Sequence, residues 1–187
     1  MTTQRGTLFL VVGPSGAGKD SLIQAAKARL ANDSRFVFPP RIITRASPLP
    51  GEDYIHSPQD GFQMAEEGNA FMLHWHTYGH AYGIPGYVTQ YLDQGRHVIV
   101  NSSRDCITDA IARFSPVIVF DIHVAMPTAF QRLKERGRED EEEIAKRLKR
   151  YDHPIPDHAT LVTIDNNGPF EASVQAIVSR LLAVAGD

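Results

Sequence analysis

Short apolar runs alternate with amphipathic segments along this chain of 187 residues. The first run, residues 7–12, is rich in β-forming side chains and leads into a glycine-rich turn. In the segment that follows, residues 21–30, four apolar side chains recur at the spacing of one helical face: Leu22, Ile23, Ala26 and Leu30. Because this periodicity distinguishes helices from strands, the beginning of the chain predicts a strand, a loop and a helix.

Three more apolar runs, residues 97–100, 116–122 and 160–164, are each bordered by segments with helical periodicity. Strands that alternate with helices over this length form a mainly parallel sheet that helices cover on both faces. We therefore expect an α/β fold.

Two parts of the chain depart from simple alternation. Residues 36–94 are rich in aromatic residues, prolines and glycines, which predicts a lobe inserted in the sheet domain. Further on, helices are predicted over residues 128–134 and 141–150, separated by a break at Gly137, and a closing helix over residues 170–184.

The composition is that of a compact globular protein. Hydrophobic residues make up 42% of the chain and charged residues 22%, and 19 Lys and Arg stand against 22 Asp and Glu, for a net charge of −3. A chain of this length forms one domain, and its apolar runs are shorter than the ~20 residues that span a bilayer. General nucleic-acid or membrane binding would need a broad basic surface, so we expect neither. If the ligand is an anion, the positive charges that bind it must be concentrated in one part of the chain.

The N-terminus and the single cysteine exclude further classes. Residues 7–12 are too short for a signal-peptide core and lead directly into glycines, so we expect a cytoplasmic protein. Cys106 has no partner for an internal disulfide or a CxxC motif, and we interpret it as a buried apolar side chain rather than a nucleophile. The sequence leaves open whether the chain is a monomer or a homodimer.

The turn after the first strand carries the most specific motif of the chain. It matches the first seven positions of G-x-x-x-x-G-K-[ST] in the required context, between a strand and a helix. Its residues are Gly13, Pro14, Ser15, Gly16, Ala17, Gly18 and Lys19. Glycines let the backbone wrap a phosphate, amide hydrogens and the helix N-terminus attract it, and the lysine reaches the β- and γ-phosphates. We therefore predict a nucleotide-phosphate site rather than an ordinary turn.

The eighth position departs from the motif. Asp20 stands where Ser or Thr usually ligates magnesium, and Ser21 follows. A carboxylate is a good ligand for Mg²⁺, which Asp20 would bind directly or through water. The alternative is that Asp20 only complements the dipole of the first helical turn. We favour the metal role, because a carboxylate beside ATP phosphates is repelled unless a cation lies between them.

A cluster of basic residues predicts a second phosphate-binding element. Residues 132–150 contain eight Lys and Arg and six acidic residues, a local net charge of 8 − 6 = +2. Alone, this pattern is typical of a solvated, salt-bridged helix pair. With a phosphate-binding loop upstream, we interpret it as a lid in which Arg132 and Arg136 share a helical face, Gly137 is a hinge, and Arg147 follows. Arginine suits this role because its planar fork contacts two phosphate oxygens.

Together, these motifs resemble the guanylate-kinase-like family of P-loop kinases over nearly the whole chain. They occur in the family's order: residues 13–19, Thr44-Arg45, Pro50-Gly51-Glu52, Gly68-Asn69-Ala70-Phe71, Tyr78-Gly79, Tyr82-Gly83, Arg132-Leu133, Arg136-Gly137 and Ala145-Lys146-Arg147. The resemblance implies one kinase domain over residues 1–187, with a P-loop core, an acceptor-binding lobe over about residues 36–92 and an arginine-rich lid over about residues 132–149. It also implies ATP and Mg²⁺ as cofactors.

The resemblance further implies a role for each matching side chain. Lys19 would hold the ATP phosphates, and Asn166 falls near the loop that borders adenine. Arg45 and Tyr54 would hold the phosphate of the acceptor, and Tyr82 lies in the same substrate-binding segment. Three arginines would hold the phosphoryl group during transfer: Arg132, Arg136 and Arg147.

The positions that read guanine in this family are altered. Guanylate kinases use a glutamate, a serine and an aspartate there, whereas this chain has Leu73, Pro85 and Ser103. None of the three offers a carboxylate to guanine, and each lost hydrogen bond reduces discrimination by ~1–3 kcal/mol. A second phosphate-binding arginine is also missing after Arg45. We therefore do not expect guanine in the acceptor.

The variant motifs resemble instead the ribose 1,5-bisphosphate phosphokinase branch of the family. They include Lys19-Asp20-Ser21-Leu22, Arg41-Ile42-Ile43-Thr44-Arg45 and Val100-Asn101-Ser102-Ser103-Arg104. The resemblance implies ATP-dependent phosphorylation of the 1-phosphate of ribose 1,5-bisphosphate. Asn101 and Arg104 then become candidates for the sugar hydroxyls or a phosphate, against the alternatives of helix capping and a surface charge. A nucleoside-monophosphate kinase and a non-catalytic binding module are the alternative functions.

Three histidines, His74, His76 and His80, suggest a zinc site, with His74 and His76 on one face of an extended strand. Because no cysteine or carboxylate completes the ligand set, we favour substrate contact or packing for these side chains.

Overall fold

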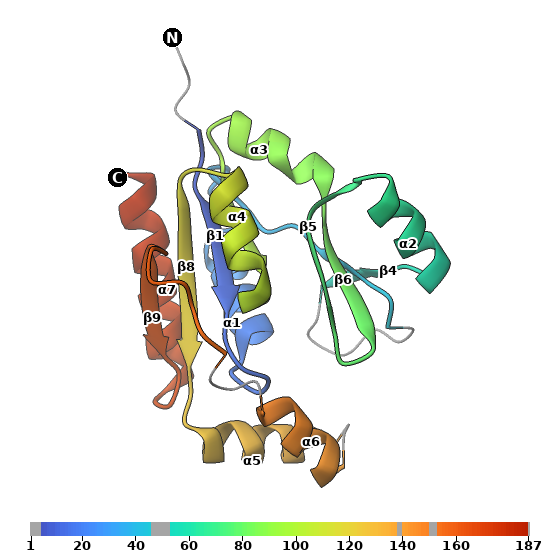
Figure 1. The fold of residues 1–187 in the computed structure, drawn as a ribbon. Helices are drawn as coiled ribbons and strands as arrows, with labels where there is room; N and C mark the ends of the chain where they lie inside the picture. The colour runs from blue at the N-terminus through green and yellow to red at the C-terminus, as the bar shows by residue number, and fades with distance from the viewer. Residues whose placement is uncertain (1–4, 46–52, 138–139, 150–152, 187) are drawn as a thin grey trace.

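The computed structural model describes the chain except residues 1–4, 46–52, 138–139, 150–152 and 187. Its core is a five-stranded sheet in the order β2-β7-β1-β8-β9, in which every neighbouring pair is parallel (Figure 1). The strands are β1 (Leu8–Val12), β2 (Phe36–Val37), β7 (His97–Asn101), β8 (Val117–His123) and β9 (Leu161–Asp165). Four of them coincide with the predicted apolar runs, and the α/β fold class is confirmed.

The central strand β1 is buried over its whole length, and its side chains divide between two apolar clusters. Phe9 and Val11 pack with α1 (Lys19–Arg29) and α7 (Phe170–Ala185) on one face of the sheet. The even-numbered residues of β1 pack with α4 (Ile107–Arg113) on the other face. Side chains alternate along a strand, so a strand covered on both faces is apolar throughout.

A second, four-stranded sheet in the order β4-β3-β6-β5 stands beside the core (Figure 1). It consists of β3 (Arg41–Ile43), β4 (Tyr54–His56), β5 (Phe71–Thr77) and β6 (His80–Pro85). Strands β3 and β4 are parallel, and the other pairs are antiparallel. Helix α2 (Gln59–Glu67) lies on the side of this sheet that faces away from the core.

The second sheet is joined to the core at both of its ends. Phe36 and Val37, the first residues of the expected lobe, pair with β7 in the core sheet, so the second sheet begins only at Arg41. At the other end, a short helical turn, η1 (Gly86–Val88), continues into α3 (Thr89–Asp93) and leads back to β7.

Helices α5 (Met126–Arg136) and α6 (Glu141–Leu148) follow β8 across the carboxyl end of the core sheet (Figure 1). Gly137 ends α5 with a φ of 63°, a left-handed conformation that glycine adopts without strain. Asp140 and Glu143 form a capping box that begins α6. Within the described ranges, no helix is both long and apolar enough to cross a bilayer.

Candidate active site

The predicted phosphate-binding loop is fixed by close contacts at its glycines. Gly16 has a φ of 82°, and a Cβ atom there would lie 2.7 Å from the carbonyl oxygen of Ala129 in α5. Gly18 has a φ of 88°, and its Cβ would lie 2.8 Å from Nδ2 of Asn166. Only glycine adopts these positive φ angles without strain and leaves room for the neighbouring atoms, because it has no Cβ. The loop is thereby held against both α5 and Asn166, which follows β9.

Lys19 lies within the loop, as the motif predicts. Its Nζ donates hydrogen bonds to the carbonyl oxygens of Gly13 at 2.7 Å and Pro14 at 2.9 Å. Burial lowers the pKa of Lys19 to about 8, although the neighbouring Asp20 opposes this effect. A bound phosphate would favour the charged ammonium, so nucleotide binding and protonation of Lys19 support each other.

Asp20 links three elements of the fold. Its Oδ1 accepts a hydrogen bond from Nη2 of Arg41 at 2.8 Å and another from Nδ2 of Asn101 at 2.7 Å. Asp20 belongs to α1, Arg41 to the second sheet, and Asn101 ends β7. A carboxylate has about four acceptor positions, so these two donors leave capacity for a hard cation. With the hydroxyl of Ser21 on the same pocket wall, the oxygen donors fit Mg²⁺.

Arg104 occupies a similar position next to β8. Its Nη2 lies 2.7 Å from Oδ1 of Asp121, with both side chains about 15% exposed, and its Nη1 donates to the carbonyl of His153 at 2.8 Å. Arg104 is therefore not a surface charge. Nor does Asn101 cap a helix: the residue that caps the turn η2 (Arg104–Cys106) is Ser103.

Two arginines of α5 line the pocket, and one of them, Arg132, lies beside the loop. Nη2 of Arg132 donates to the carbonyl of Asn166 at 2.9 Å, while its Nη1 is buried and has no hydrogen-bond partner among the described residues. A Cβ atom on Gly18 would lie 3.9 Å from this Nη1, so the group is adjacent to the loop. A buried donor of this kind is costly unless a ligand accepts from it. Arg136, one helical turn on, lines the same pocket.

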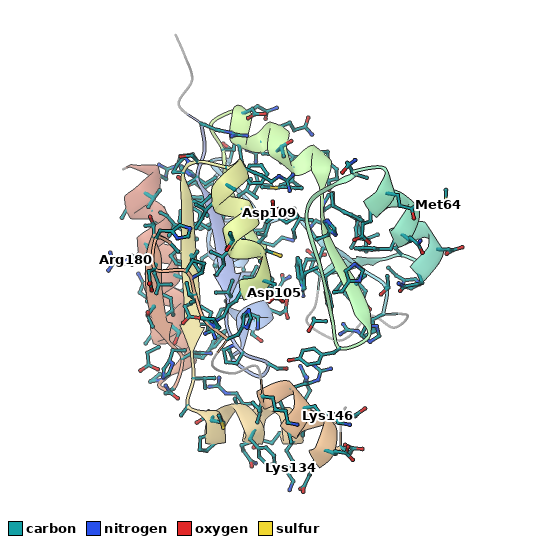
Figure 2. The ribbon with its side chains drawn as sticks, viewed as in Figure 1. Met64, Asp105, Asp109, Lys134, Lys146 and Arg180 are labelled. Carbon is teal, nitrogen blue, oxygen red and sulfur yellow. The ribbon has the colours of Figure 1, made fainter. Side chains whose placement is uncertain are left out.

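Arg147 spans the pocket from α6. Its Nη1 donates to Oγ of Ser15 at 3.4 Å, and its guanidinium lies 4.9 Å from the ring centre of Tyr78, whose hydroxyl donates to the carbonyl of Arg147. By contrast, Lys134 and Lys146 pair with exposed glutamates and point away from the pocket (Figure 2). Helices α5 and α6 thus have a solvated, salt-bridged outer face and an arginine-lined face toward the pocket.

The residues that the resemblance assigns to the acceptor lie on or next to the second sheet. The guanidinium of Arg45 lies 5.3 Å from the ring centre of Tyr54, whose hydroxyl donates to the Arg45 carbonyl at 3.4 Å. Tyr82 stacks on Trp75 with ring centres 5.4 Å apart. Arg45, Tyr82 and Trp75 line the pocket, whereas Tyr54 supports Arg45 from behind.

A single cavity of about 400 Å³ joins these groups. It contains most of the side chains that the sequence assigns to the site, including Lys19, Asp20 and the three lid arginines. Ala17 and Asn166 do not line the cavity. The buried side chain of Asn166 donates a hydrogen bond to the carbonyl of Ala17 at 2.8 Å and so stabilises the loop.

Sequence reasoning does not assign Arg41, Tyr78 or His153 to the site, yet all three line the cavity. The sequence does carry a signal that could have placed Arg41 in the site. It precedes Arg45 by four residues in an extended segment, and such residues share one side of a strand.

Cys106 is buried, and burial raises its pKa to about 11, which agrees with an apolar side chain rather than a nucleophile.

Comparison with known proteins places this geometry in a family. The profile described as "Guanylate kinase" matches residues 5–182. The "Ribose 1,5-bisphosphate phosphokinase PhnN" of Brucella melitensis is 39% identical over 184 residues, which cover 98% of this chain and 95% of that protein. The "Bifunctional ribose 1,5-bisphosphokinase-thymidine phosphorylase" of Roseobacter denitrificans is 41% identical over 97% of this chain, which spans only 27% of that relative's length.

The fold shows the same relationship at lower sequence similarity. The crystal structure of guanylate kinase from Anaplasma phagocytophilum superimposes with a TM-score of 0.68 and covers 100% of this chain and 90% of that one, at 16% identity. The profile match spans nearly the whole chain, and it confirms the family that the motifs predict. The chain belongs to the guanylate kinase family.

Proposed function

We propose that the chain transfers the γ-phosphoryl group of ATP to the 1-phosphate of ribose 1,5-bisphosphate, which gives 5-phosphoribosyl 1-diphosphate and ADP. Use of ATP follows from membership of the guanylate kinase family. The name of the full-length relative from Brucella melitensis supports the acceptor. The chain acts as one kinase domain, in which the second sheet binds the acceptor and α5 and α6 form the lid.

The observation that carries this proposal is the presence of three arginines in the cavity beside the predicted phosphate-binding loop. Arg41, Arg45 and Arg104 all line the cavity, and the positive charges of Arg41 and Arg104 act on Lys19. A phosphate monoester carries about −1.5 to −2 charges at pH 7, and a sugar bisphosphate brings two such groups in one small ligand. A guanidinium has five N–H donors, so the ion pair with Asp20 orients Arg41 without using all of them. Several cationic anchors suit a bisphosphate better than a nucleobase.

The altered guanine-reading positions support the same acceptor. Leu73 is fully buried in the apolar cluster beneath the second sheet, and Pro85 is buried as well. Ser103 reaches the cavity, but its hydroxyl donates to the carboxylate of Asp105 at 2.9 Å as part of a helix cap. These side chains supply no carboxylate for the N–H groups of guanine.

In the proposed reaction, an oxygen of the acceptor's 1-phosphate attacks the γ-phosphorus in line, and the bond from phosphorus to the ADP oxygen breaks. The second pKa of a phosphate monoester is about 6, so this oxygen is already anionic at pH 7 and needs no catalytic base. Catalysis then consists of positioning and charge neutralisation. Four side chains would provide both: Lys19, Arg132, Arg136 and Arg147.

Two further features complete the mechanism. Mg²⁺, held by Asp20 and Ser21, would supply additional charge neutralisation at the ATP phosphates. The contacts of Arg147 with Ser15 and Tyr78 join the lid to the loop and to the second sheet. This closure would keep water from the phosphoryl group, which would otherwise be lost by hydrolysis.

A coupled assay of ADP release tests the proposal. Purified protein with Mg·ATP would be offered ribose 1,5-bisphosphate, ribose 5-phosphate, GMP or other nucleoside monophosphates, and the diphosphate product would be identified by ³¹P NMR. We expect the largest kcat/KM with ribose 1,5-bisphosphate, and no turnover by a folded Lys19→Ala variant. A larger kcat/KM with GMP would overturn the proposal in favour of a nucleoside-monophosphate kinase. Absence of Mg·ATP binding in calorimetry would favour a non-catalytic module.

A further inference from the structure

The outer face of the second sheet carries a cluster of metal-ligating side chains that is separate from the phosphate pocket. From Leu73 to His76, strand β5 alternates between buried and exposed residues, so His74 and His76 lie on one face and Trp75 on the other. Trp75 lines the kinase cavity, whereas the two histidines do not. Helix α2 lies over the histidine face (Figure 1) and brings Glu66 to them.

The three side chains converge on one point. Nδ1 of His74 lies 3.0 Å from Oε1 of Glu66, and Nε2 of His76 lies 3.2 Å from each oxygen of the same carboxylate. All three ligand atoms lie within 4.8 Å of one another. His80, the third histidine of the sequence motif, begins the neighbouring strand β6 and is not part of the cluster.

These distances suit a small tetrahedral ion. Bonds of about 2.0–2.1 Å to a zinc ion place neighbouring ligand atoms about 3.3 Å apart. The distances from Oε1 of Glu66 to Nδ1 of His74 and to Nε2 of His76, 3.0 and 3.2 Å, are close to this value. The two histidine nitrogens lie within 4.8 Å of each other, and a small movement of these exposed side chains brings them to the same separation. Two imidazoles and a carboxylate form a donor set of Zn²⁺ and similar borderline-soft cations, with the fourth position open to water. Mg²⁺ prefers an octahedral set of oxygens and fits poorly.

The helix and the strand that carry the ligands are held together by apolar contacts. Phe62 precedes Glu66 by one helical turn and stacks on Phe71 of β5 with ring centres 4.5 Å apart. Both rings are buried, and each is about 6.1 Å from one of the histidine rings. The ligands therefore project from elements whose relative position is fixed by packing, which lowers the entropic cost of metal binding. Sequence spacing alone does not reveal Glu66, because it belongs to a different element.

We propose that Glu66, His74 and His76 form a binding site for one Zn²⁺ ion, which links α2 to β5. The ion replaces hydrogen bonds between the histidines and the carboxylate by three metal–ligand bonds. Because the site lies on the far side of β5 from the kinase cavity, its effect is to stabilise the second sheet rather than to take part in phosphoryl transfer. The inference does not depend on the identity of the acceptor.

The test uses tag-free, full-length protein treated with a chelator and then titrated with ZnCl₂ in a calorimeter, with thermal unfolding as a second readout. We expect one ion per chain and a raised Tm, and no comparable change with MgCl₂. His74→Ala, His76→Ala and Glu66→Gln should each lower the Zn²⁺ affinity at least tenfold. His158→Ala removes an exposed histidine outside the cluster and should bind like the wild type. Substitution of Co²⁺ should give the intense visible absorption of tetrahedral coordination.

Two results would overturn the proposal. One is wild-type protein that binds no stoichiometric Zn²⁺. The other is the same affinity in the cluster variants as in the wild type, since binding would then lie elsewhere. The affected side chains are exposed or half-buried, so the variants should fold, and circular dichroism before titration checks this. The Glu66→Gln variant keeps the size of the side chain and removes only its charge, which separates metal ligation from packing.

Discussion

Asp20 and Arg41 form an ion pair with 2.8 Å between Oδ1 and Nη2, across the boundary between α1 and the second sheet. The Arg41 side chain is only 10% exposed, and the same carboxylate oxygen accepts a hydrogen bond from Asn101. A carboxylate at position 20 therefore has a structural role besides any role in binding metal. It neutralises a nearly buried guanidinium and joins α1 to the second sheet and to β7.

Replacing Asp20 should affect both stability and metal use. Asp20→Ala leaves Arg41 buried without its carboxylate, so the free energy of unfolding should fall by about 1–3 kcal/mol in urea denaturation. If Asp20 holds Mg²⁺, the concentration of the ion that gives half-maximal activity should rise. Asp109→Ala, which removes an exposed i,i+4 pair with Arg113, is a control that should change neither. An unchanged magnesium titration would remove Asp20 from the metal site.

Lys19 should impose an alkaline limit on activity. Burial lowers its pKa to about 8, and the phosphates of ATP interact with the charged form. The kcat/KM for ATP, which reports the free enzyme, should therefore fall above pH 8, by up to about tenfold per pH unit. Lys19→Arg remains charged and should lose this descending limb whatever its absolute rate. A wild-type profile that stays level well above pH 8 would contradict the assignment.

The same group should make stability depend on pH. The unfolded chain keeps the proton of Lys19 up to about pH 10.4, whereas the folded chain releases it near pH 8. The unfolded state thus binds more protons between these values, so Lys19 contributes a rise in the free energy of unfolding with pH in that range. Urea denaturation of wild type and Lys19→Met should differ in this slope. Equal slopes would mean that the folded-state pKa is not lowered.

Two basic residues of α5 should behave differently. Arg132 has a buried Nη1 beside the phosphate-binding loop, whereas Lys134 pairs with Glu141 in solvent. Arg132→Ala should lower kcat by about 10²-fold or more, because an arginine that stabilises a transferring phosphoryl group has effects of this size or larger. Lys134→Ala should leave kcat unchanged within about twofold. Similar kcat values for the two variants would refute the lid assignment.

Acceptor binding should depend on Arg45. A charge-assisted hydrogen bond contributes about 1.5–3 kcal/mol, so Arg45→Ala should raise the KM for the sugar bisphosphate by about 10- to 100-fold and leave the KM for ATP nearly unchanged. Arg113→Ala, which removes an exposed arginine of α4, is the matched control. Initial-rate kinetics with each substrate varied in turn measure both constants. If only the KM for ATP rises, Arg45 binds the nucleotide and its assignment to the acceptor is wrong.

The features that sequence predicts best here are local. The core strands and the loop from Gly13 to Lys19 follow from hydrophobic periodicity and from one contiguous motif. By contrast, β2 is only two residues long, which is too short to show a period, and its place in the core sheet becomes visible only through pairing with β7. The helices that follow the loop and that close the chain were predictable in place, though not to the residue, because helical periodicity depends on near neighbours in the chain.

The less predictable features are contacts between distant segments. Asn166 falls in a segment that the family pattern places near adenine, yet its amide is buried and donates to Ala17, 149 residues earlier. Arg41 meets Asp20 because β3 lies against the nucleotide site, and Glu66 meets two histidines because α2 lies against β5. In each case the partner is determined by tertiary packing, which residue types and spacing alone do not specify.

The close approach of Gly16 to Ala129 limits which side chains residue 16 can carry. Any side chain at residue 16 would press on the backbone of α5, since even a Cβ atom would lie 2.7 Å from the Ala129 carbonyl oxygen. A methyl group there would displace the nucleotide loop and the helix that carries Arg132 at the same time. The position of the loop and the position of α5 therefore depend on the same glycine.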